Sequence, residues 1–106
     1  MRYLVKWKMS PVPGRTPQEK AKTALALVEA TDAWVEEEKK AGRLVEIWTY
    51  TAGGEGIDIW EVDSNDALFE KLQECPYPAT WTVTPLTDFK LSMKVFKEEL
   101  KKVAGD

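Results

Sequence analysis

Two carboxylates on expected strands, Glu46 and Asp58, are the side chains of this sequence best suited to catalysis. A carboxylate whose pKa is raised in an apolar pocket can act as the base that moves a proton next to a carbonyl group. Glu46 is the stronger candidate because it shares a strand face with Trp48 and Tyr50. Glu61 is a third carboxylate on an expected strand.

The alternative interpretation gives these acids no chemistry. They would then be charges at the rim of a sheet, where charged side chains discourage aggregation, and would pair with Lys6, Lys8 or Arg43.

The aromatic side chains of the strands are the candidates for ligand binding. A flat or cyclic ligand would suit a pocket built from large rings, and the rings expected on strands are Trp48, Tyr50, Trp60 and Trp81. Such rings also serve as core or as packing between subunits, and Trp34 is expected in the core.

Several classes of site are disfavoured by composition. The chain has no His and one cysteine, Cys75, so neither an imidazole base nor a cysteine cluster for a metal is available, and we expect no metal and no cofactor. The net charge of −3 and the pI near 5.1 argue against nucleic acid as a partner. No apolar run approaches the length of a membrane span, and we expect a cytoplasmic protein that does not bind membranes.

The first half of the sequence predicts a strand and a long helix. Residues 2–9 alternate apolar and polar side chains, which is the period of a strand. Thr16 and Pro17 are typical of a helix start, Glu19 can complete a capping box, and Gly42 provides a left-handed stop.

The second half predicts three strands and two helices. Residues 43–52 and 57–62 form a hairpin around a turn at 53–56, and Asp63 or Ser64 caps a short helix that ends before Pro76. Residues 79–84 alternate as a last strand, and residues 90–103 show one apolar side of a terminal helix.

This element order predicts a single α+β domain, residues 1–106, of the ferredoxin-like βαββαβ kind. Its four-stranded antiparallel sheet would carry the first two helices on one face, with the C-terminal helix added. The other face of the sheet would be bare and apolar, and packing two such faces together predicts a homodimer.

Three segments of the sequence resemble the muconolactone isomerase family. They are Trp48 with the glycine turn that follows it, the stretch from Ile57 to Leu68 with its Val-Asp-Ser-Asn-Asp-x-Leu corner, and Trp81 to Leu86 with its Val-Thr-Pro-Leu ending. The resemblance implies a dimeric α+β barrel with a small pocket between its two sheets.

The family's site residues do not carry over. Its first helix has Lys, Arg and Glu where this chain has Val28, Ala30 and Asp32, and Glu46 replaces a His before the strand tryptophan. The resemblance therefore transfers the fold and not the chemistry.

Three functions follow from this reading. The favoured function is a small-molecule-binding barrel for a cyclic or aromatic ligand. The second is a cofactor-free isomerase that acts on a small lactone or cyclic acid and uses Glu46 or Asp58. The third is a structural or interaction protein that acts through self-association, with the terminal helix as its docking element. A haem-degrading barrel is weaker, because no His is present to bind the iron.

Overall fold

A computed structural model describes residues 1–105 of the chain. The elements follow the order β-α-β-β-α-β-α, and their bounds are β1 Arg2–Met9, α1 Pro17–Lys40, β2 Leu44–Thr49, β3 Glu55–Glu61, α2 Asn65–Gln73, β4 Ala79–Leu86 and α3 Phe89–Ala104.

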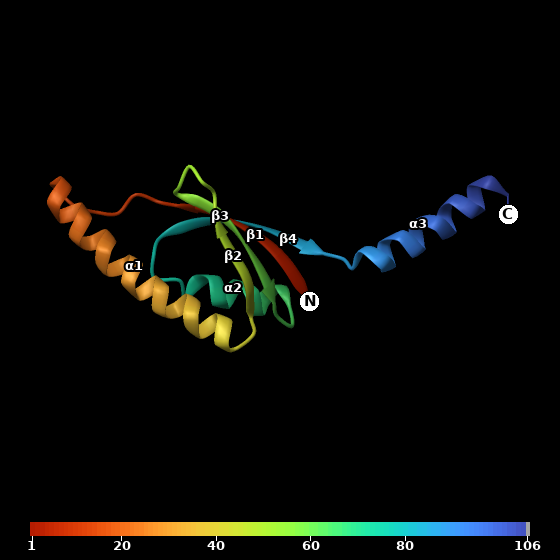
Figure 1. The fold of residues 1–106 in the computed structure, drawn as a ribbon, viewed down its shortest axis with the longest axis horizontal. Coiled ribbons are helices and arrows are strands. Elements are labelled where there is room, and N and C mark those ends of the chain that lie inside the picture. Colours follow the sequence, from red (N-terminus) through yellow and green to blue (C-terminus); the bar gives the residue numbers. More distant parts are fainter. Residues whose placement is uncertain (106) are drawn as a thin grey trace.

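The four strands form one antiparallel sheet in the order β2-β3-β1-β4. Helices α1 and α2 lie on the same side of this sheet, and α3 leaves the domain from the end of β4 (Figure 1). The ferredoxin-like arrangement expected from the element order is therefore confirmed. No helix within residues 1–105 combines the length and the apolar character that crossing a membrane requires.

The helices start and stop where their capping residues predict. Thr16 Oγ1 accepts a hydrogen bond from the backbone N–H of Glu19 at 3.2 Å, and Ser64 Oγ accepts one from Ala67 at 3.1 Å. Gly42, just beyond α1, has a φ of +77°, the left-handed conformation that ends a helix.

The hairpin differs from the prediction in its turn and its bounds. The turn is tighter, with Gly53 and Gly54 at positive φ, and the backbone N–H of Tyr50 donates to Glu55 O at 2.8 Å. Glu55 and Gly56, expected in the turn, therefore belong to β3. A register shift between Leu44 and Glu46 places Leu44 and Ile47, rather than Val45 and Ile47, toward the helices.

Strand β4 runs two residues further than expected, through Pro85 to Leu86. A proline cannot donate a ladder hydrogen bond, and it is tolerated here because β4 is an edge strand with only β1 beside it.

The core lies between the sheet and the two packed helices. Its buried apolar residues come from all the strands except β4, from α2 and from the residue that follows β3: Tyr3, Val5, Leu44, Trp60, Val62, Leu68 and Leu72. Trp34 and Val35 of α1 pack against them, as expected for Trp34.

A buried ion pair ties the end of α1 to the rest of the domain. The Glu38 carboxylate is 2% exposed, accepts hydrogen bonds from the Arg43 guanidinium, and lies 3.7 Å from Lys71 Nζ of α2. The hydrogen bond from Arg43 outweighs the effect of burial and holds the pKa of Glu38 below its ordinary value.

Candidate active site between the sheet and helix α1

Asp58 is the only Asp of residues 1–105 that the fold buries. Side chains of β3 alternate, so Gly56, Asp58 and Trp60 face the helices while Ile57 and Ile59 face the other way. The backbone of Asp58 pairs with Val5 of β1 on one side and with Ile47 of β2 on the other. Asp58 therefore lies in the middle of the sheet, and its side chain is 2% exposed.

Two indole groups hold the Asp58 carboxylate. Trp7 Nε1 donates to Oδ1 at 3.0 Å, and Trp60 Nε1 donates to Oδ2 at 3.1 Å. An indole N–H can only donate, so each oxygen receives one fixed, uncharged donor. No Lys or Arg within residues 1–105 forms an ion pair with this carboxylate.

Burial raises the pKa of Asp58 to about 6. Removing a carboxylate from water disfavours its charged form, and the hydrogen bonds from Trp60 and Trp7 lower the pKa by less than burial raises it. At neutral pH the group is therefore ionised, and it is a stronger base than an ordinary Asp.

Gly56 gives Trp7 the room to reach Asp58. A Cβ atom at residue 56 would lie 2.3 Å from Trp7 Cζ2, 2.6 Å from Trp7 Cε2 and 2.1 Å from the backbone oxygen of Trp48. These contacts are too close for any side chain. The glycine thus lets the Trp7 ring lie close to β3, where its Nε1 donates to the carboxylate.

A cavity of about 560 Å³ opens between α1 and the sheet, with Asp58 in its wall. This volume lies within the usual range for small-molecule sites. The main apolar side chains of the walls are Trp7 and Ile47 of β1 and β2, Trp34 and Val35 of α1, Tyr77 of the loop before β4, and Trp81 of β4.

Trp34 contributes an unused donor to this region. Its ring lies 5.6 Å from that of Trp60, centroid to centroid, at an interplanar angle of 44°. Its Nε1 atom is buried and has no hydrogen-bond partner within the part of the chain that the structure describes. Buried polar atoms are nearly always paired, so this N–H is available to an oxygen that the chain itself does not supply.

Apart from Asp58, the charged side chains at the cavity come from one side of α1. Asp32, Glu36 and Lys39 line it, and Lys39 is the only Lys or Arg among the lining residues. One cation therefore stands at the cavity beside three carboxylates, those of Asp32, Glu36 and Asp58.

The structure divides the predicted site residues between the two faces of the sheet. Asp58, Trp60 and Trp81 lie on the helix side, where Asp58 and Trp81 line the cavity. Glu46 and Trp48 pair with Ile59 and Ile57 on the bare side and are exposed.

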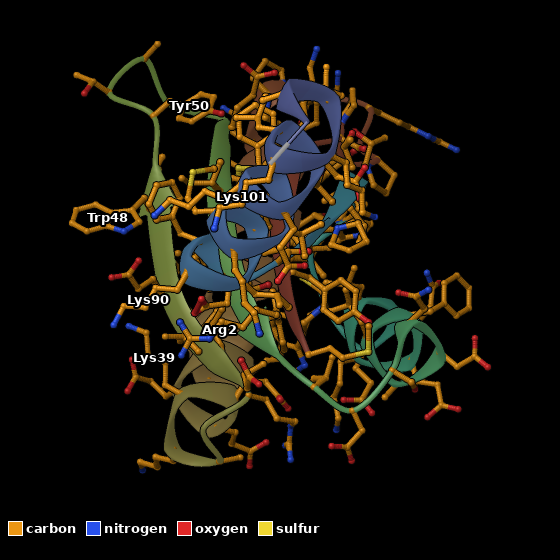
Figure 2. The ribbon with its side chains drawn as sticks, turned by 90° about the vertical axis from the view of Figure 1, so that its right-hand side faces the viewer. Arg2, Lys39, Trp48, Tyr50, Lys90 and Lys101 are labelled. Carbon is orange, nitrogen blue, oxygen red and sulfur yellow. The ribbon has the colours of Figure 1, made fainter. Side chains whose placement is uncertain are left out.

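Tyr50 lies near the turn that follows β2, away from Asp58. Figure 2 shows the Trp48 indole pointing away from β2 into open space. Tyr50 borders a smaller hollow of about 330 Å³ with Lys6 and Lys8, and is not among the residues that line the Asp58 cavity.

Trp7, Gly56 and Lys39 belong to the site but were not expected in it. Trp7 is on the same face of β1 as Tyr3 and Val5, a pattern that was visible in the sequence. Its hydrogen bond to Asp58 depends on the register of β1 against β3, which pairs Trp7 with Gly56.

The bare face of the sheet has an apolar half and a polar half. Leu4, Trp48, Ile57 and Ile59 gather on β1, β2 and β3, while threonines of β4 and lysines of β1 complete the face. Trp48 is 62% exposed, which is unusual for so large an apolar side chain.

Comparison with family models agrees with this fold. The family model described as muconolactone delta-isomerase matches residues 1–91. Among solved structures, the X-ray structure of protein Atu4242 from Agrobacterium tumefaciens is similar, with 17% identity and a TM-score of 0.43 over 84% of this chain and 96% of that one. No curated protein matches the chain.

Proposed function

Because the chain belongs to the muconolactone delta-isomerase family, we propose that it binds a small unsaturated lactone or related cyclic acid in the cavity under α1, and that Asp58 moves a proton on it. The observation that carries this proposal is the buried Asp58 carboxylate, held by two indoles, in the wall of that cavity.

The proposed reaction is a proton shift that needs no cofactor. The ionised Asp58 takes a proton from a ring carbon that is acidified by the conjugated carbonyl, and the electron pair of that C–H bond moves into the ring. The same carboxyl then returns the proton to a carbon at the other end of the conjugated system. The double bond moves, and no proton or electron is gained or lost overall.

The environment of Asp58 supports both halves of this shift. A base works best when its pKa is near the working pH, and burial raises the pKa of this group to about 6. The indole hydrogen bonds from Trp7 and Trp60 fix the orientation of the carboxyl while it changes its charge.

The rest of the cavity supports a ring-shaped ligand. Trp34 and Trp81 offer flat apolar walls, and Lys39 offers the one cation for a ligand carboxylate. The unpaired Trp34 Nε1–H supplies a donor for a ligand carbonyl oxygen.

We also propose that two copies pair through the bare faces of their sheets. The exposed Trp48 and the apolar neighbours Ile57 and Ile59 support this contact, since a monomer rarely exposes such a patch. Glu46 would then lie at or near the contact between subunits and not in the cavity.

The first test is a fluorescence titration with muconolactone and related cyclic acids. The rings of Trp7, Trp34 and Trp81 line the cavity, so a bound ligand should change the tryptophan emission saturably. Silence across the whole panel would contradict the proposed ligand class.

The second test separates catalysis from binding. Asp58→Asn should reduce turnover of a ligand found in the titration by at least about 100-fold, the usual contribution of a general base, while the ligand still binds. Glu46→Gln is the matched control and should keep its turnover. Equal turnover in wild type and Asp58→Asn would remove Asp58 from the mechanism.

The alternative proposal is a non-enzymatic protein that acts through self-association. Its support is α3, a helix without buried residues that extends away from the domain (Figure 1). A silent ligand panel together with a stable assembly would favour this alternative.

A further inference from the structure

The cavity beside Asp58 carries more negative charge than positive charge. Its wall holds the carboxylates of Asp32, Glu36 and Asp58 and one ammonium group, that of Lys39, so negative charge is in excess at neutral pH. Cys75 is also in the wall, and burial raises the pKa of its thiol, which is therefore uncharged at this pH. A ligand that enters the cavity meets a negative field.

The innermost of these charges is Asp58, and no cation offsets it. Its side chain is 2% exposed, and its two oxygens accept hydrogen bonds from Trp7 Nε1 at 3.0 Å and from Trp60 Nε1 at 3.1 Å. Both donors are uncharged, and within residues 1–105 no Lys or Arg forms an ion pair with this carboxylate. Like charges repel each other far more strongly where water is excluded than in bulk water. A second carboxylate placed against Asp58 is therefore strongly disfavoured.

Lys39, the one cation at the cavity, stands among acids of its own helix. It follows Glu36 by three residues and Asp32 by seven, so the three side chains share one side of α1. Residues three apart on a helix are neighbours, and an acid and a base at this spacing attract each other. All three side chains are exposed to water, which screens their charges. Lys39 therefore marks the mouth of the cavity and does not neutralise its interior.

The buried donor without a partner is uncharged as well. Trp34 Nε1 has no hydrogen-bond partner within residues 1–105, and its ring lies 5.6 Å from that of Trp60, which donates to Asp58. One N–H group satisfies one carbonyl oxygen. A buried carboxylate needs a cation or several donors to offset the loss of its hydration, and Trp34 supplies a single donor. This donor therefore suits a carbonyl group better than an acid.

We propose that the cavity selects uncharged ring compounds, with neutral unsaturated lactones as the reactive ones, over ligands of the same shape that carry a carboxylate. The inference rests on the proposed function and narrows its ligand class from lactones and cyclic acids to neutral lactones. It is supported by the unpaired charge of Asp58, by the two acids at the mouth and by the uncharged donor of Trp34.

A neutral lactone also suits the proposed proton shift. When Asp58 takes a proton from the ring, its negative charge moves onto the conjugated carbonyl of the lactone, and it returns to Asp58 when the proton goes back. The interior then holds a single negative charge at every stage, and an N–H donor such as that of Trp34 stabilises this charge on the carbonyl oxygen. A lactone with a free carboxylate would add a second negative charge at every stage.

The test compares two ligands that differ in charge and hardly in size. They are the saturated analogue of muconolactone, which cannot isomerise, as its free acid and as its primary amide. Each is titrated at neutral pH into the full-length protein, with tryptophan emission as the readout, since Trp7, Trp34 and Trp81 line the cavity. We expect the amide to bind at least about tenfold more tightly than the acid, because only the acid places like charges together.

The outcomes separate this inference from the proposed function. Equal affinities, or tighter binding of the acid, would overturn the selection of uncharged ligands and leave the proposed lactone site standing. Silence from both compounds would overturn the ligand class of the proposed function, and this inference with it.

Variants at the mouth trace the preference for the amide to the charges of the cavity. Asp32→Asn combined with Glu36→Gln should lower this preference at least about threefold, because it removes two negative charges from the wall. Glu37→Gln is the matched control, since Glu37 is an exposed acid of the same helix that does not line the cavity, and it should leave the preference unchanged. An unchanged preference in the double variant, or an equal fall in the control, would overturn the proposal.

Asp58→Asn tests the innermost charge. The free acid should bind at least about tenfold more tightly to this variant than to the wild type, and the affinity for the amide should change by less than about threefold. Circular dichroism checks the fold of the variant, and the mouth variants give the same measurement without any change in the core. An affinity for the acid that does not rise in folded Asp58→Asn would overturn the proposal.

Discussion

The two faces of the sheet carry the same sequence pattern with opposite results. On β3, Asp58 stands two residues before Trp60; on β2, Glu46 stands two residues before Trp48. The first pair faces the helices, and there the carboxylate is buried and bonded by indoles. The second pair faces away from the helices, and both of its side chains are exposed.

The comparison teaches that a carboxylate beside a tryptophan is not a site by itself. Its chemistry depends on which face of the sheet the helices cover, and this is a property of the whole fold. Burial raises the pKa of Asp58, and a cavity gives a ligand access to it. Glu46 is exposed and does not line that cavity.

The largest expected effect comes from removing the space under Trp7. Gly56→Ala would place a methyl group against the Trp7 ring and the Trp48 backbone oxygen. The clash with Trp48 is costly because a backbone oxygen in a sheet cannot shift as easily as the end of a flexible side chain. We expect a loss of about 3 kcal/mol in the free energy of unfolding, measured by urea denaturation. Glu55→Ala, at the exposed neighbouring position, should change it by less than about 0.5 kcal/mol.

The second expected effect is a pH dependence that belongs to Asp58. The pKa of Asp58 is about 6 in the folded chain, against 3.8 for an ordinary Asp side chain, so the folded state binds the proton more tightly. Its contribution to stability is fully present below pH 3.8 and is lost as the pH rises through 6. Between pH 4.5 and 8 this amounts to about 2 kcal/mol.

The carboxylate variants isolate that contribution. The free energy of unfolding of Asp58→Asn, measured by urea denaturation, should not show this decline with pH. That of Glu46→Gln should decline as it does in the wild type. The pH range from 4.5 to 8 lies above the pH at which Glu38, whose pKa is lowered, loses its ion pair with Arg43. A wild-type stability that does not fall from pH 4.5 to 8 relative to Asp58→Asn would contradict the raised pKa.

The third prediction concerns the bare face. Trp48→Thr should weaken self-association about 30-fold, the effect of losing one buried aromatic anchor of roughly 2 kcal/mol, without unfolding the domain. Analytical ultracentrifugation over a dilution series measures it. The control is Tyr50→Thr, near the turn, for which a smaller change is expected; if neither variant dissociates more readily, the bare faces do not meet.

Most of the fold could be predicted from local signals in the sequence. Thr16 and Ser64 mark helix starts through their side-chain oxygens, and Gly42 marks a stop through its left-handed backbone. The hairpin bounds were harder, because the prediction assigned four residues to a turn in which Gly53 and Gly54 alone take positive φ.

The site could be predicted only in part. The sequence identifies both Asp58 and Glu46 as candidate bases and favours Glu46, because Glu46 shares a strand face with Trp48 and Tyr50. Choosing between them requires the register of β1 against β3, which pairs Trp7 with Gly56 and brings the Trp7 indole to Asp58. These contacts join residues about 50 positions apart, and no local pattern encodes them.

The smallest expected effect tests the indole hydrogen bonds directly. Trp7→Phe keeps an aromatic ring but removes the donor to Asp58 Oδ1, so the pKa of Asp58 should rise further and its ionised form should lose stability. We expect a loss about 1.5 kcal/mol greater at pH 8 than at pH 4.5, because the hydrogen bond is stronger when the carboxyl is charged. Trp48→Phe on the bare face should show no such difference in urea denaturation at the two pH values. Equal losses at both pH values in Trp7→Phe would mean that Trp7 stabilises the chain by packing alone, and that the contrast between the two faces lies in burial and not in the indole donors.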